Sequence, residues 1–121
     1  MSFRDLPAAS LQIDGRMTFL RVYDASRFLA RARGLLGRDR LHPHEALWIR
    51  PCGSVHTVGM RYALDLVFVD AEQRVLAIKQ HVEPRRFVGH VRARSTIELL
   101  AGIAAQLSIA PGAKLERVVL S

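Results

Sequence analysis

The chain has 121 residues, half of them hydrophobic, which is enough for one ordinary core and too few for two. Its formal charge is +7, and the arginines are scattered along the chain instead of forming one block, so dedicated nucleic-acid binding is possible but not favoured. A single cysteine excludes an internal disulfide, and no apolar run approaches the roughly 20 residues of a membrane-spanning helix. We therefore expect a cytoplasmic protein without membrane association.

The first elements expected along the chain are an arm and a hairpin. Residues 1–10 show no clear pattern and predict a frayed arm. Residues 11–13 and 16–23 flank Asp14-Gly15, which is a strong signal for a two-residue hairpin turn. We assign residues 1–16 to the N-terminal arm and first hairpin strand, and residues 17–121 to the rest of the same single domain.

A helix is predicted directly after this hairpin. Asp24 is suited to cap its first turn, and an apolar stripe follows at helical spacing. Gly34 stands where a helix commonly ends in a left-handed residue. The polar sequence of residues 38–45, which contains His42-Pro43-His44-Glu45, predicts a solvated surface loop.

The remaining sequence predicts mostly strands. They are expected at residues 46–50, 64–69, 74–81, 96–100 and 114–120, with a short helix or turn at 101–107. Residues 83–94 carry four arginines, a proline and a glycine, and predict a mobile surface crossing that could serve as a lid. The expected fold is α+β and mainly β: a compact, curled or barrel-like antiparallel sheet with one clear helix.

The densest chemistry lies between Cys52 and Asp70. In an extended backbone, Cys52, His56 and Met60 share one face of the segment. A closed zinc site needs four ligands, and the paired motifs that usually supply them are absent, so we expect neither a metal nor another cofactor. His56 could activate Cys52 as a nucleophile, although a lone intracellular cysteine is more often an inert buried residue.

Two acidic residues stand in apolar strands and need an explanation. Asp65 lies in the strand at 64–69, and Glu98 lies between Ile97 and Leu99 in a second one. A buried carboxylate must be paired, capped or functional. The two carboxylates could shape one polar pocket with His56 or an arginine, or each could simply bind backbone amides or an arginine at the end of its own strand.

Several separated motifs resemble one family of small prokaryotic proteins, domain of unknown function 192. The residues that carry the main motif are Cys52, Ser54, His56, Thr57, Met60, Arg61, Asp65, Val67, Phe68 and Asp70. Segments 33–36 (RGLL), 97–102 (IELLAG) and 111–112 (PG) are also similar to the family's pattern, whereas Leu36, Ala63 and Ala113 depart from it. The resemblance implies a mainly β fold with one helix near its start, and matched motif positions at His56, Met60, Asp65 and Glu98. It implies no established activity.

Three hypotheses for function remain. The first is a small-ligand binding or accessory domain with a pocket around His56, Met60, Asp65 and Glu98, and with Arg33 or Arg61 as a charge partner. The second is an enzyme that uses His56 and a carboxylate for acid/base or hydrolytic chemistry. The third is a basic adaptor whose arginine-rich crossing binds nucleic acid or an acidic partner.

Overall fold

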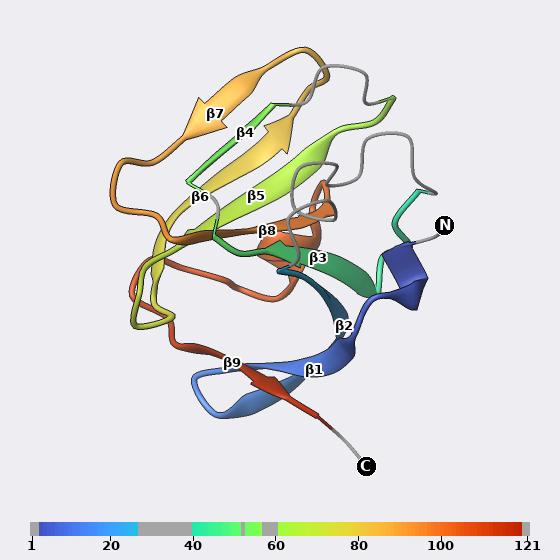
Figure 1. Cartoon of the computed structure of the whole chain (residues 1–121), viewed down its shortest axis with the longest axis vertical. Coiled ribbons are helices and arrows are strands. Elements are labelled where there is room, and N and C mark those ends of the chain that lie inside the picture. Colours follow the sequence, from blue (N-terminus) through green and yellow to red (C-terminus); the bar gives the residue numbers. More distant parts are fainter. Residues whose placement is uncertain (1–2, 27–39, 52, 57–60, 120–121) are drawn as a thin grey trace.

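The computed structural model describes residues 3–26, 40–51, 53–56 and 61–119, with backbone alone at residues 55 and 56. Seven strands form one strongly curled sheet, and two short strands form a separate ribbon (Figure 1). The large sheet contains β1 (Ala8–Ile13), β2 (Arg16–Ala25), β3 (Glu45–Ile49), β5 (Leu64–Val69), β6 (Val75–Val82), β8 (Ser95–Leu100) and β9 (Leu115–Val118). The ribbon contains β4 (Ser54–His56) and β7 (Phe87–Gly89). The described helices are a 3-10 turn, η1 (Phe3–Asp5), and α2 (Ile103–Gln106).

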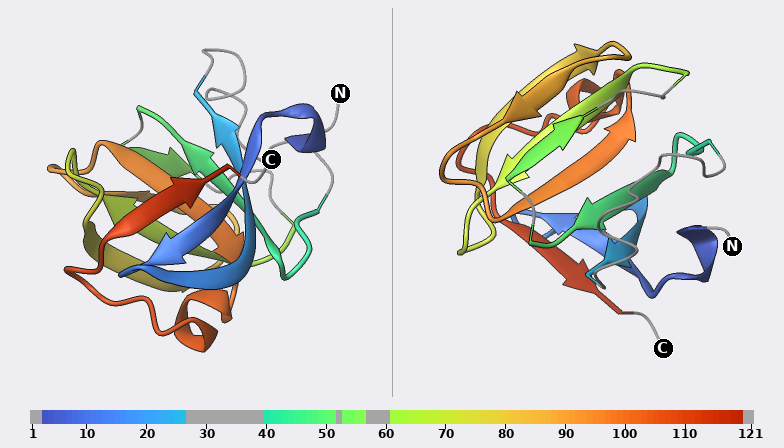
Figure 2. Two further views of the ribbon diagram at one scale, coloured as in Figure 1. Left: turned by 90° about the horizontal axis from the view of Figure 1, so that it is seen from below. Right: turned by 45° about the horizontal axis from the view of Figure 1, so that its top comes forward.

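The strand order in the large sheet is β6-β5-β8-β3-β2-β1-β9. Its neighbours are antiparallel except for β2 and β3, which run parallel, so the prediction of an antiparallel sheet was wrong for this one pair. Figure 2 shows how strongly the sheet curls. Its two edges approach one another where Arg74 bridges to Lys114 and the Val75 amide donates to the Ala113 carbonyl at 2.9 Å.

Apolar side chains pack against both faces of the sheet. One core includes residues of both edge strands, such as Val75 and Leu115, and is closed by Ile103 and Ala104 of α2, so it fills the inside of the curl. A second core lies on the outer face. Because β5 contributes to both, all six of its residues are buried, as its continuous apolar sequence predicted.

The first hairpin forms as predicted. Asp14 and Gly15 have φ angles of 51° and 79°, which fit the two-residue turns that match the twist of a hairpin. The preceding segment does not fray: Phe3 is fully buried in the outer core, where its ring meets that of Tyr23 edge to face at a centroid distance of 5.2 Å. The arm prediction was therefore wrong for residues 3–10, because a single buried aromatic gives no periodic signal.

The predicted helix after Asp24 is not found in the described residues, whose longest helix is α2, with four residues. Asp24 and Ala25 instead close β2, and residues 27–39 lie outside the described part. The crossing predicted at residues 83–94 contains β7, which pairs with β4 through Val55 and Val88. Strands predicted near β3, β6, β8 and β9, and the short helix at α2, are confirmed within about two residues.

Candidate functional site

Asp65 is fully buried, and its carboxylate binds the backbone. The His81 amide donates to Oδ1, and the amides of Gly102 and Ala104 donate to Oδ2, each at 3.0 Å. The β5–β6 register is irregular at this point, and both His81 (φ 52°) and Gly102 (φ 97°) are left-handed. The bulge leaves the His81 amide without a partner in the sheet, and the amides at the start of α2 have no partner within the helix. The Asp65 carboxylate accepts hydrogen bonds from both groups. Of the two sequence interpretations of Asp65, the structure supports backbone binding.

Glu98 does not share a pocket with Asp65. Directly opposite residues in an antiparallel pair point to the same face, and β5 and β8 pair Asp65 with Leu99 and Leu66 with Glu98. Leu99 belongs to the inner core and Leu66 to the outer core, so Asp65 points inward and Glu98 points outward. The hypothesis that both carboxylates line one cavity is contradicted by this register.

The outer face carries a second buried carboxylate, Glu45. The sequence predicted a solvated loop at this position, and that prediction was wrong for Glu45. Glu45 begins β3 and is only 3% exposed, as is Glu98. Leu47, two residues further along β3, lies directly opposite Glu98, so the two glutamates are diagonal neighbours on one face. The polar residues before Glu45 predicted a loop, so no local pattern indicated that a buried strand begins at Glu45.

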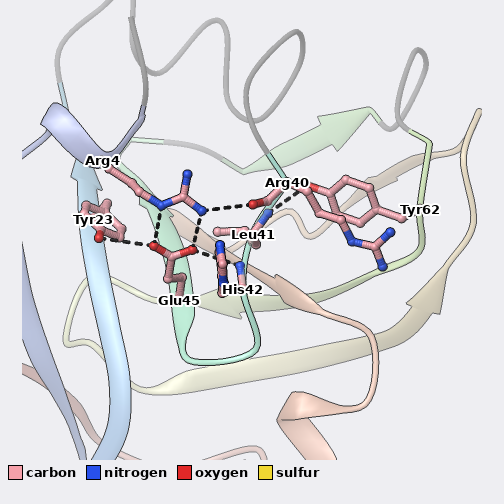
Figure 3. A network of polar contacts seen from close by, with 7 residues as sticks. All are labelled: Arg4, Tyr23, Arg40, Leu41, His42, Glu45 and Tyr62. Atoms are coloured by element: carbon pink, nitrogen blue, oxygen red, sulfur yellow. Dashed lines mark hydrogen bonds and ion pairs between the residues drawn. The ribbon is translucent and has the colours of Figure 1, made fainter.

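A network of hydrogen bonds holds Glu45 (Figure 3). The Arg4 guanidinium donates to both carboxylate oxygens at 2.7 and 2.8 Å, the His42 amide donates at 2.8 Å, and the Tyr23 hydroxyl lies 3.3 Å from Oε2. Burial raises the pKa of Glu45, but the bonds from Arg4 and His42 and the charge of Arg4 outweigh it, so the pKa lies below its ordinary value. This network anchors η1, and with it Phe3, to the outer face.

The same network extends to Tyr62. Arg4 also donates to the Arg40 carbonyl at 3.1 Å, and the next amide, that of Leu41, donates to the Tyr62 hydroxyl at 3.4 Å. Arg40 places its guanidinium 4.6 Å from the centre of the Tyr62 ring. Burial, and secondarily the negative charge of Glu98, raise the pKa of Tyr62, although the Leu41 amide and nearby arginines lower it in part. Tyr62 is therefore close enough to Glu98 to respond to its charge.

The other predicted site residues are placed less fully. Arg61 is exposed and directly precedes Tyr62. His56 ends β4, but its side chain lies outside the described part, as do Arg33, Cys52 and Met60. Because acid/base chemistry and the Cys52 nucleophile both need these side chains, the two hypotheses stay predictions. Within the described ranges, no group of three or more His, Cys, Asp or Glu side chains is placed to hold a metal ion.

A cavity of about 340 Å³ near the end of β2 was missed altogether. Asp24, predicted as a helix cap, lines it together with Arg117, and its Oδ2 accepts from Arg50 at 2.8 Å and Arg117 at 2.9 Å. Arg117 also lies 5.3 Å from the centre of the Trp48 ring. Parallel pairing of β2 with β3 brings Arg50 and Trp48 beside Asp24, and pairing of β1 with β9 positions Arg117. No sequence motif predicts these pairings.

Comparison with solved structures supports the fold. The crystal structure of a "putative transcription regulator" from Sinorhizobium meliloti matches with a TM-score of 0.82 and 20% identity, over 97% of this chain and 96% of that one. A protein of unknown function from Novosphingobium aromaticivorans matches with a TM-score of 0.77 and 24% identity, over 92% and 86% of the two chains. At these identities, the likeness concerns the fold alone.

No curated protein matches the sequence. In the described residues, no helix is long and apolar enough to cross a membrane. The family model of domain of unknown function 192, described as "Uncharacterized ACR", matches residues 9–117. This match includes every motif on which the resemblance was based. The chain belongs to the family named domain of unknown function 192.

Proposed function

We propose that the chain is a small-ligand binding or accessory domain, and that its ligand binds on the outer face of the sheet beside Glu98 and Tyr62. The observation that carries the proposal is a carboxylate only 3% exposed within an apolar face, close enough to a half-buried tyrosine to raise its pKa. Binding sites are typically apolar surfaces with a few polar groups that fix the ligand's orientation.

The residues of this face favour a ligand of particular chemistry. Glu98 supplies a negative charge on the outer face, and Tyr62 is close enough to respond to that charge. A small molecule with an amine or guanidine group complements this arrangement, because a cation is attracted to both the carboxylate and the aromatic ring. His56, Met60, Arg33 and Arg61 remain the proposed additional contacts. Asp65 is not among them, since its oxygens accept backbone amides on the inner side.

The proposal can be tested with a panel of amines, guanidines and neutral polar metabolites. Thermal shift would identify compounds that stabilise the full chain, and calorimetry would measure their affinity. For a compound that binds at this face, Glu98→Gln should weaken binding by about tenfold or more, since hydrogen bonds to charged groups contribute about 1.5–3 kcal/mol.

The matched control is Glu116→Gln, which removes an equal charge from an exposed position in β9. It should leave affinity unchanged, and Tyr62→Phe should reduce it. If no compound of the panel binds, or if Glu98→Gln and Glu116→Gln weaken binding equally, the ligand site does not lie at Glu98.

A further inference from the structure

The region around β7 leaves apolar side chains in water. Phe87 is 80% exposed and Val91 is 99% exposed, and Phe87 is the most exposed aromatic residue in the described part of the chain. Figure 1 shows β7 at the opposite end of the molecule from β9, on the outside. Burial of a phenylalanine contributes about 1.5–3 kcal/mol, so exposure of this ring forgoes a substantial stabilisation. A binding partner that covers the ring would gain this stabilisation.

An open groove of about 520 Å³ lies beside this ring, between β6 and β7. Its walls combine the Phe87 ring with the positively charged side chains of Lys79 and Arg86, and Val88 adds apolar surface. His81, exposed in its left-handed position at the bulge, also faces the groove. The groove therefore combines an exposed aromatic residue with two cationic residues.

The charge around the groove favours an anionic partner. Lys79 and Arg86 line the groove with two positive charges, and Glu83 adds one negative charge. Arg85, which directly precedes Arg86 in the sequence, is a third exposed cation nearby. The ion pair between Arg86 and Glu83 has a distance of 3.7 Å, and its side chains are 63% and 73% exposed, so it contributes little stability. The whole chain carries +7, which further favours encounters with polyanions.

We propose that this groove, defined by Lys79, Arg86, Phe87 and Val88, binds single-stranded nucleic acid together with the neighbouring Arg85. Single strands combine phosphates, which cations bind, with bases whose faces stack on exposed aromatic rings. In a duplex the bases are already stacked on one another, so no base is available to stack on the Phe87 ring. The proposal does not depend on the ligand site at Glu98.

Fluorescence anisotropy with labelled oligonucleotides tests this proposal on the full chain. Single-stranded DNA and RNA of about 15 nucleotides should bind, and a duplex of the same length should bind several times more weakly. Three phosphate contacts predict that affinity falls by about 20-fold between about 50 mM and about 200 mM salt. An absence of single-strand binding at the lower salt, or a preference for the duplex, would overturn the proposal.

Two pairs of variants locate the binding surface. Phe87→Ala should reduce single-strand affinity by about tenfold, because stacking of one base is lost. The control Phe19→Ala, at a half-exposed ring on β2, should have no effect. Arg86→Gln should lower both the affinity and its salt dependence, whereas Arg21→Gln, also on β2, should change neither.

Thermal unfolding of each variant confirms that it is folded before its binding is compared. A polyglutamate peptide serves as a competitor that has charge but no bases. If it displaces the oligonucleotide at equal charge concentration, or if Phe87→Ala binds as the unmodified chain does, the surface recognises charge alone. Either result would refute base stacking at Phe87 and favour an acidic protein as the partner.

Discussion

Asp65 and Glu98 lie on neighbouring strands, one register position apart, yet their side chains point to opposite faces of the sheet. Asp65 faces the inner core, where it accepts three backbone amides, and Glu98 faces the outer core near Tyr62. Two carboxylates in similar apolar strands therefore have two different roles. Substitutions at the two positions should have separable effects, on stability for Asp65 and on the properties of the outer face for Glu98.

Asp65→Asn should destabilise the fold by about 3 kcal/mol. An asparagine keeps one acceptor oxygen, but its NH2 group would face an amide that also donates, so at least one buried amide loses its partner. Urea unfolding of the variant measures the loss. Asp70→Asn is the matched control, since Asp70 Oδ1 also accepts two amides, those of Glu72 and Arg74, but in an exposed turn. A loss at Asp65 no greater than that at Asp70 would contradict the assigned role.

The Glu45 network predicts a loss of stability in acid. Its pKa is lowered in the folded state, so its contribution is complete above the unfolded value of about 4.3 and is lost as the pH falls through the folded value. Glu45→Gln should cost about 2 kcal/mol near neutral pH, where charged hydrogen bonds from Arg4 are lost. Unfolding measured between about pH 7 and about pH 3 should show this difference shrinking toward acid. A constant difference would show that the charge of Glu45 contributes nothing.

Tyr62 should titrate above the ordinary tyrosine range, with Glu98 as one of the causes. Burial disfavours its phenolate first, and the negative charge of Glu98 disfavours it further. Glu98→Gln removes that charge, so the pKa of Tyr62 should fall toward its ordinary value. Ultraviolet titration measures this, and a Tyr23→Phe background isolates the signal because the chain has two tyrosines. An unchanged titration in Glu98→Gln would separate the two residues and weaken the proposed ligand site.

Gly102→Ala should destabilise the fold by about 1 kcal/mol, although the added methyl would meet nothing within 4 Å. The cost arises from the left-handed backbone, with φ of 97°, which aligns the amide of Gly102 with Asp65. Ser108 has φ of 56° without being glycine, so Ser108→Gly should not destabilise in this way. Thermal unfolding compares the two variants. A neutral Gly102→Ala would show that this conformation is not required.

Local patterns in the sequence predicted the elements that have strong local causes. Asp14-Gly15 specifies its own turn, and the continuous apolar run at residues 64–69 specifies a strand buried on both faces. Phe3 is not part of a periodic apolar pattern, and the sequence just before Glu45 is polar. Neither pattern therefore predicted that the residue is buried. In those two cases the contacts that bury the residue come from far along the chain.

The candidate site was less predictable because it depends on register. Alternation within one strand shows which of its residues share a face. It does not show which residues of the neighbouring strand lie on that same face, because this depends on the register. For Asp65 and Glu98, the pairing of β5 with β8 decides the question. The parallel pairing of β2 with β3, which places Arg50 beside Asp24, is likewise a tertiary relationship. Residue types alone could therefore identify important carboxylates without assigning their surroundings.

The incomplete closure of the sheet has a consequence for self-association. Only the beginning of β6 is bonded to the chain near β9, where Gly112 donates to the Val75 carbonyl at 2.8 Å. Further along, the described part of the β6 edge pairs with no strand, and residues 79–81 are exposed. A lysine and a bulge on an open edge make it a poor template for the strand of another molecule. The irregularity that Asp65 holds in place should therefore also protect concentrated protein from edge-to-edge polymerisation.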